Sequence, residues 1–165
     1  MRKVTTPFGD PNRQKIAVWA AAMLDAAEKT AKQIGCSPEA IVAQAALESG
    51  WGRASIGHNI FGIKADASWT GKKQLVTTRE FRNGQYVTIQ DWFRDYDTFE
   101  ESIEDHFRFL RDNARYANVF TAGSDEAYFT ALQHDGYATD PHYAQSLIGV
   151  RNTVRSLETH MTMSA

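Results

Sequence analysis

Apolar residues recur every three or four positions between Ile16 and Ile34, and this spacing predicts a long amphipathic helix. Asp10 is suited to cap the helix, Pro11 to be its first residue and Gly35 to end it. The residues expected on its buried stripe are Ile16, Ala20, Met23, Leu24, Ala27, Ala31 and Ile34. One face of this helix should therefore belong to the core.

A second, shorter helix is predicted from Pro38 to Glu48, with Ser37 as its N-cap. Ile41, Ala45 and Glu48 recur at helical spacing, so Glu48 shares a face that is otherwise apolar. Partial loss of water raises the pKa of a carboxyl group, and a neutral carboxylic acid can donate a proton. Glu48 is therefore a candidate general acid. A glutamate ion-paired at a helix end fits the pattern equally well.

The clearest strand signal surrounds Asn83 and Gly84, a dipeptide suited to a two-residue hairpin turn between residues 73–81 and 85–93. In the register that this turn sets, Glu80 lies opposite Val87 on a mostly apolar face. The opposite face is expected to hold Leu75, Arg79, Phe81, Tyr86 and Trp92. Glu80 is a second candidate carboxylate, although a solvated acid near a hairpin tip explains the pattern equally well.

The rest of the chain is predicted to be helical. Thr98 begins one helix with a capping-box pattern, Ser124 caps a shorter one, and Asp140 with Pro141 opens the last. Because His106 falls on an apolar stripe, we interpret it as a core histidine with one satisfied nitrogen rather than a ligand. The residues expected to be buried on the last helix are Tyr143, Leu147, Val150, Val154 and Leu157.

The composition indicates a single globular domain. The chain has 165 residues, of which 42% are hydrophobic and 23% are charged. We expect its core at about residues 11–157, a loop over residues 50–72, a loose leader at residues 1–9 and a frayed tail at residues 159–165. A formal net charge of -2 without a basic tract argues against nucleic-acid binding, and we expect a monomer.

Several kinds of chemistry are disfavoured by the sequence. The single cysteine, Cys36, excludes an internal disulfide and a multi-thiolate metal site. The five histidines lack metal-ligand spacing and no phosphate-binding glycine loop appears, so we expect no metal and no cofactor. No apolar run is long enough to span a membrane. The remaining candidate residues are carboxylates and aromatic side chains, which suit carbohydrate chemistry. A carboxylic acid can protonate a glycosidic oxygen, and aromatic rings pack on sugar faces. These candidates are Glu48, Glu80, Asp91, Trp51, Trp69, Tyr116 and Tyr137.

Five segments resemble, in the same order, the endo-β-N-acetylglucosaminidases of glycoside hydrolase family 73, which include the peptidoglycan-hydrolase half of the flagellar rod-capping protein. They are AQAALESGWG at 43–52, GHNIFGIK at 57–64, ASWTG at 67–71, TTREF at 77–81 and GYATDP at 136–141. The resemblance extends over roughly residues 11–157. Several separate motifs in one order make it specific.

The resemblance implies a lysozyme-like α+β fold that is mainly helical, with a small β-hairpin lobe across a cleft. It implies that Glu48 is the general acid, that Glu80 is the second carboxylate and that Tyr137 assists at the cleaved sugar. The residues that it implies for substrate binding are Asn59, Phe61, Trp69, Tyr116 and Thr139. The expected activity is cleavage of the β-1,4 glycan backbone of peptidoglycan, as an endo-β-N-acetylglucosaminidase.

Two alternatives to this activity stay open. The first is muramidase specificity on the same fold, in which the other glycosidic bond of the glycan strand is cleaved. The second is a catalytically inactive peptidoglycan-binding module. The presence of both Glu48 and Glu80 argues against the inactive module, because binding alone does not require two placed acids.

The route to the periplasm or cell wall is also open. The apolar run at 16–24 loosely resembles a signal peptide, but Pro7, Asp10 and Pro11 before it favour a folded helix. Without a clear signal peptide, the expected routes are release through a holin, as for a phage lysin, or delivery by a secretion system, as for an antibacterial effector. The effector hypothesis predicts a cognate immunity protein that fills the cleft, meets Glu48 and Glu80, and contacts the hairpin tip.

Overall fold

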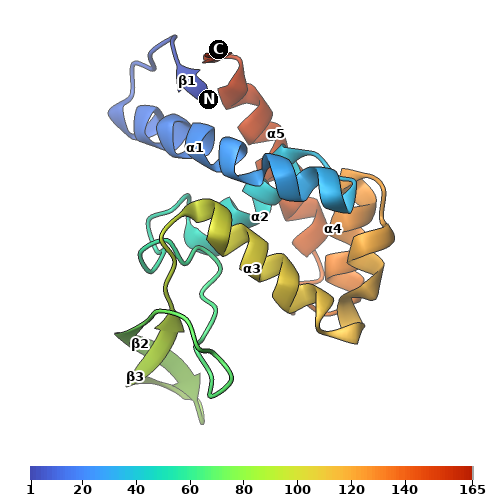
Figure 1. The fold of residues 1–165 in the computed structure, drawn as a ribbon. Coiled ribbons are helices and arrows are strands. Elements are labelled where there is room, and N and C mark those ends of the chain that lie inside the picture. The colour runs from blue at the N-terminus through green and yellow to red at the C-terminus, as the bar shows by residue number, and fades with distance from the viewer. Residues whose placement is uncertain (165) are drawn as a thin grey trace.

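The computed structural model describes residues 1–164 and combines a group of helices with two small antiparallel sheets (Figure 1). The helices form one lobe, and the hairpin of β2 and β3 projects from it. In chain order the elements are β1 (Arg2–Val4), α1 (Pro11–Ile34), α2 (Pro38–Ser49), β2 (Lys73–Arg82), β3 (Gln85–Arg94), α3 (Phe99–Arg111), the 3-10 segment η1 (Ala114–Thr121), α4 (Asp125–His134), α5 (Tyr143–Glu158) and β4 (Met161–Met163). This is the mainly helical α+β architecture predicted from the sequence.

Helix α1 begins and ends at the predicted residues. Asp10 Oδ1 accepts a hydrogen bond from the backbone N–H of Asn12 at 2.9 Å and so caps the helix. Gly35 ends it with a φ of 75°, a left-handed conformation that glycine adopts without steric cost. The predicted buried stripe is confirmed except for Ile16, which is half-buried.

Helix α2 is the central helix of the core. All residues from Ala40 to Ala46 are buried, because α2 packs between α1 and α5. Ser37 Oγ accepts a hydrogen bond from the backbone N–H of Ala40 at 3.2 Å, and Gly50 ends the helix in the left-handed conformation with a φ of 57°. Glu48 therefore leaves the core only at the last turn of α2, where solvent reaches it.

The β2–β3 hairpin has the predicted register, with Glu80 opposite Val87. Asn83 and Gly84 have positive φ angles of 49° and 81°, as both central residues of a type I′ turn require. The face that carries Glu80 is mostly half-buried. On the opposite face, the large exposed side chains are Leu75, Phe81, Tyr86 and Trp92.

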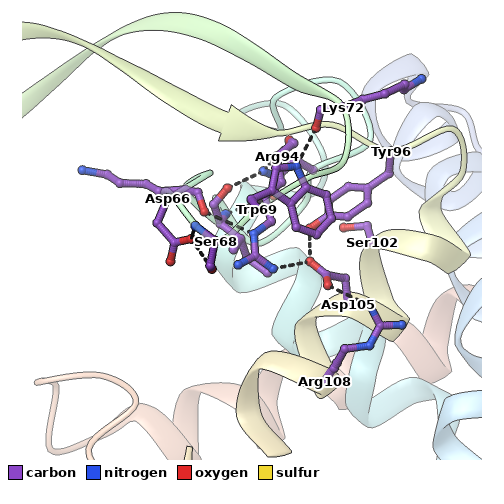
Figure 2. Close-up of polar contacts among 12 residues, drawn as sticks. Asp66, Ser68, Trp69, Lys72, Arg94, Tyr96, Ser102, Asp105 and Arg108 are labelled. Carbon is purple, nitrogen blue, oxygen red and sulfur yellow. Dashed lines mark hydrogen bonds and ion pairs between the residues drawn. The ribbon is translucent and has the colours of Figure 1, made fainter. Parts of the chain in front are cut away.

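A buried ion pair joins the base of the hairpin to α3 (Figure 2). Arg94 Nη1 donates to Asp105 Oδ2 at 2.8 Å, and the Tyr96 hydroxyl donates to the same oxygen at 2.5 Å. The side chains of Arg94 and Asp105 are only 12% and 6% exposed. The ring of Trp69 covers the guanidinium, with 4.4 Å between the Arg94 Cζ atom and the ring centroid. These contacts fix where the hairpin leaves the helical lobe.

The two ends of the chain are paired with each other, so the predictions of a loose leader at 1–9 and a frayed tail at 159–165 are wrong over the described residues. β1 pairs antiparallel with β4, with Arg2 opposite Met163. Arg2 also donates hydrogen bonds to Asp25 at 3.0 Å and Glu28 at 2.7 Å on α1. Strands of three residues leave almost no local pattern, and their partners lie at opposite ends of the sequence.

Two other predictions need smaller corrections. Helix α5 begins at Tyr143 rather than Asp140, whose Oδ1 instead accepts a hydrogen bond from the His142 backbone N–H at 2.8 Å. Val150, predicted to be buried on this helix, is half-buried. The segment η1 was not predicted. Among residues 1–164, no helix combines the length and the apolar character needed to cross a bilayer.

Candidate active site

Glu48 stands at the exposed end of α2 and contacts the C-terminal helix. The Tyr143 hydroxyl, on α5, donates a hydrogen bond to Glu48 Oε1 at 2.8 Å. Solvent reaches the carboxyl group, but the surrounding protein removes enough water to raise its pKa. The hydrogen bond from Tyr143 opposes that shift because it stabilises the carboxylate. The environment therefore favours a protonated Glu48 at a higher pH than for an ordinary glutamate, as a proton donor requires.

Tyr137 lies beside this pair. Its ring stacks on that of Tyr143, with 5.9 Å between the centroids, and meets the edge of the Tyr116 ring at 6.1 Å. Burial, and secondly the nearby Glu48 carboxylate, raise the pKa of the Tyr137 hydroxyl. Tyr137 therefore stays a neutral phenol, able to donate a hydrogen bond near Glu48.

Glu80 has the opposite electrostatic environment. Lys64 Nζ lies 2.8 Å from Glu80 Oε1, and Arg82 Nη2 lies 2.7 Å from Oε2. The hydrogen bonds from Lys64 and Arg82 lower the pKa of Glu80. Lys64 Nζ also lies 2.7 Å from Asp91 Oδ2, so one ammonium group serves two carboxylates. The two candidate acids thus differ: Glu48 tends to hold its proton and Glu80 tends to stay ionised.

A pocket of about 310 Å³ lies between the hairpin base, α3 and the loop before α5. Lys64, the partner of Glu80, lines this pocket, and so does Tyr137, the neighbour of Glu48. Phe61 lines it as well, with its ring stacked on His106 at a centroid distance of 3.8 Å. The pocket therefore connects the surroundings of the two carboxylates. Among residues 1–164, no group of three or more His, Cys, Asp or Glu side chains is placed to hold a metal ion.

The structure does not support a substrate contact for two of the predicted residues. Asn59 is fully buried, and its amide bonds the backbone of Ile63 and Arg94, so the prediction that it lines the cleft is wrong. Its role is to attach the loop after α2 to strand β3. Tyr116 is only 4% exposed, and its hydroxyl accepts a hydrogen bond from Arg115 at 2.6 Å. Tyr116 therefore supports Tyr137 rather than presenting a face to a sugar.

Trp69 and Thr139 do not line the pocket that Phe61 and Tyr137 line. Trp69 packs on Arg94 at the hairpin base, and its Nε1 donates to the Lys72 carbonyl at 2.9 Å. Its ring lines a different pocket, of about 270 Å³, on the side of α3 that faces Lys72. Thr139 is exposed. Substrate contacts by Trp69 and Thr139 stay predictions.

The partner of Glu48 was not found from the sequence. The apolar stripe predicted that Tyr143 is buried, which is confirmed, but gave no sign that its hydroxyl reaches a carboxylate on α2. Behind it, Gln44 is fully buried, and its Oε1 accepts a hydrogen bond from the Tyr128 hydroxyl at 2.6 Å. His106 Nε2 lies 3.4 Å from the same oxygen, and burial lowers the pKa of His106 to about 3. The prediction of a core histidine is confirmed.

The chain is a glycosidase domain, and it belongs to the glucosaminidase family. The family model, described as mannosyl-glycoprotein endo-beta-N-acetylglucosaminidase, matches residues 24–156. The chain is 39% identical to the peptidoglycan hydrolase FlgJ of Pseudomonas aeruginosa over 153 residues, which are 88% of this chain and 38% of that protein. It thus spans well under half the length of this relative.

Solved structures share the fold. The glycoside hydrolase domain of Salmonella typhimurium FlgJ, in a C-terminally truncated form, superposes with a TM-score of 0.73 at 38% identity, over 86% of this chain and 98% of that chain. A peptidoglycan hydrolase mutant from Sphingomonas sp. A1 gives a TM-score of 0.74 at 39% identity, over 87% and 99%. The lysozyme-like fold expected from the sequence motifs is therefore confirmed.

Proposed function

We propose that this chain hydrolyses the β-1,4 glycan backbone of peptidoglycan as an endo-β-N-acetylglucosaminidase, with Glu48 as the general acid. The observation that carries the proposal is the contrast between the two carboxylates: the pKa of Glu48 is raised by desolvation and that of Glu80 is lowered by Lys64 and Arg82. Peptidoglycan as the substrate is supported by the relatives, since FlgJ of P. aeruginosa is named a peptidoglycan hydrolase.

In the proposed reaction, the Glu48 carboxyl group gives its proton to the glycosidic oxygen while the bond from that oxygen to the anomeric carbon breaks. Water supplies the hydroxyl group that ends on the anomeric carbon. The remaining proton of the water passes to a carboxylate of the Glu48–Glu80 set, so the two groups together hold as many protons after the reaction as before it. The ionised Glu80 is suited to stabilise the positive charge that develops on the sugar ring or to activate the water. Tyr137, a neutral donor near Glu48, is suited to hold the sugar at the cleaved bond.

Fragment analysis tests the specificity. Purified peptidoglycan is digested with the wild-type protein, and the reducing-end sugar of the released fragments is identified by mass spectrometry. Reducing-end N-acetylglucosamine is expected. Reducing-end N-acetylmuramic acid would establish the muramidase alternative instead, and binding without any release would establish an inactive module.

If the protein is delivered into a competing bacterium, we propose that the producing cell also makes a cognate inhibitor of it. The accessible Glu48 and the half-exposed Glu80 side chain leave both acids open to a protein that fills the cleft. Such an inhibitor is expected to place polar side chains against both acids and to contact the turn at Asn83 and Gly84. Co-purification from the native host tests this: a one-to-one partner that abolishes hydrolysis is expected, whereas an active, unpartnered protein encoded beside a holin would favour a phage lysin.

A further inference from the structure

Phe109 is a large apolar residue that the core of the protein does not use. It lies on α3 outside the buried stripe, and 44% of it is exposed. The buried side of α3 consists of Ser102, Ile103, Asp105, His106, Phe107 and Leu110. A single exposed apolar residue is ordinary on a protein surface. What distinguishes Phe109 is its position, because it lines the same pocket as Phe61 and Tyr137.

We call this the aromatic pocket and define it by its lining residues, which are Phe61, Gly62, Ile63, Lys64, Asp66, Arg94, His106, Phe109 and Tyr137. Its aromatic part comes from three separate parts of the chain. His106, on the buried side of α3, and Phe109, outside it, are three residues apart and so are neighbours on the helix surface. Phe61 stacks on the His106 ring at 3.8 Å, and the Tyr137 ring meets His106 edge-on at 5.8 Å. His106 therefore holds the other two rings in place.

The polar members of the aromatic pocket belong to the hairpin base and the loop before it. Lys64 reaches from there to Glu80, and Arg94 is fixed by Asp105 and by the Lys64 carbonyl at 3.2 Å. Asp66 accepts a hydrogen bond from the Ser68 backbone N–H at 2.9 Å, as Figure 2 shows. Aromatic walls beside a few fixed charged groups suit a sugar, which has an apolar ring face and a polar edge. The volume of about 310 Å³ is at the small end of ligand pockets, the size expected for one ring rather than several.

We infer that the aromatic pocket is a subsite for one N-acetylhexosamine ring of the glycan strand, next to the cleaved bond, and that Phe109 is its outer wall. The sugar packs its C–H face on Phe109, and its hydroxyl and acetamido groups turn toward Lys64, Asp66 and Arg94. Tyr137 joins this subsite to Glu48, since it lines the pocket and its ring stacks at 5.9 Å on Tyr143, whose hydroxyl donates to Glu48 at 2.8 Å. The inference rests on the proposed function, and it assigns Phe109 to substrate binding rather than to the chemical step.

The test measures binding without turnover. In a Glu48→Gln background, the probe is a tetrasaccharide of alternating N-acetylglucosamine and N-acetylmuramic acid, with affinity measured by calorimetry. Phe109→Ala is expected to weaken binding about tenfold or more, while Phe109→Trp keeps it within about threefold, because an aromatic face is what the sugar uses. The control is Val18→Ala on α1, a residue that is 54% exposed and does not line this pocket, and this variant is expected to bind as the parent does. Thermal melting confirms that each variant is folded.

Kinetics of otherwise wild-type protein provide a second measurement. Phe109→Ala is expected to raise KM about tenfold and to change kcat less than about twofold, because the lost contact is made before and during the reaction alike. Unchanged binding by Phe109→Ala, or an equal loss in the alanine and tryptophan variants, would overturn the inference while hydrolysis by the wild type leaves the proposed function standing. Absence of both hydrolysis and tetrasaccharide binding in the parent proteins would overturn the proposed function, and the inference with it.

Discussion

The hydrogen bond from Tyr143 to Glu48 is a single side-chain contact that affects the pKa of the candidate acid. It favours the ionised form of Glu48 and so works against the desolvation that raises its pKa. A general acid is active only while protonated, so activity falls as the pH rises through its pKa. The position of the alkaline limb of the pH profile therefore reports on this one contact.

Tyr143→Phe is expected to move the alkaline limb of kcat/KM to higher pH, since removing the donor lets desolvation raise the pKa of Glu48 further. Because Glu48 also loses its positioning contact, kcat is expected to fall about tenfold. The measurement is a pH–rate profile on soluble glycan fragments. An alkaline limb that moves to lower pH would contradict the assignment of Glu48 as the acid.

Lys64→Met is expected to move the acidic limb of the profile to higher pH. Lys64 is the largest cause of the lowered pKa of Glu80, so its removal raises that pKa, and a larger fraction of Glu80 is protonated at a given acidic pH. Activity that requires ionised Glu80 is then lost at higher pH than in the wild type. Lys73→Met, which removes the same charge from β2, is the control and should leave the limb unchanged. An unmoved acidic limb in Lys64→Met would show that Glu80 does not limit the reaction.

At the level of elements, the helices and the hairpin were predictable because their signals are local. Caps at Asp10 and Ser37, glycines after α1 and α2 and the Asn83-Gly84 turn all act within a few residues. The pairing of β1 with β4 was missed because it joins the two ends of the chain. Asn59 was assigned to the cleft from its motif, but its amide is used inside the protein, which only the folded structure reveals.

The candidate site was predictable for a similar reason, but only in part. Glu48 is marked by its own helix, and the hairpin register places Glu80 opposite Val87, but the ion pairs of Glu80 with Lys64 and Arg82 were not predicted. Tyr143 and Phe109 are not marked in this way. Each contacts residues from elements that are distant in sequence. Helical periodicity therefore indicates that Tyr143 is buried and Phe109 is exposed, but not which residues they contact.

The junction between the hairpin and α3 gives a prediction about stability. Arg94→Met leaves the nearly buried Asp105 carboxylate without its main partner, so the free energy of unfolding is expected to fall by about 3 kcal/mol. Lys29→Met, which breaks the more exposed pair with Glu104, is the control and is expected to change the free energy of unfolding much less, because exposed ion pairs contribute little. Urea denaturation measures both. Equal effects of the two substitutions would mean that the Arg94–Asp105 pair does not anchor the hairpin.

For the whole molecule, the packing of α2 on α5 and the pairing of the chain ends bring charged groups near one another. Glu158, at the end of α5, lies near Glu39 and Arg2, and burial followed by the Glu39 carboxyl raises its pKa to about 7. The folded protein therefore holds a proton on Glu158 over a range in which the unfolded chain, with a pKa near 4.5, has lost it. Where the native state binds more protons, stability falls as the pH rises.

Stability is accordingly expected to decline between about pH 4.5 and 7 through this group, and Glu158→Gln is expected to remove that part of the decline. The variant should be more stable than the wild type at pH 8 and closer to it at pH 4.5. Thermal melting over this range measures the difference. A Glu158→Gln protein whose stability follows the wild-type pH dependence would show that Glu158 titrates normally in the folded state.

The most direct test of the account as a whole is the hydrolysis of purified peptidoglycan by Glu48→Gln. The substitution keeps the shape of the side chain and removes only its ability to give up a proton, so kcat/KM is expected to fall by about a hundredfold or more with the melting temperature nearly unchanged. Glu100→Gln, an exposed change in the first turn of α3, is the matched control and should retain full activity. Near wild-type hydrolysis by Glu48→Gln would contradict the central claim that Glu48 is the general acid.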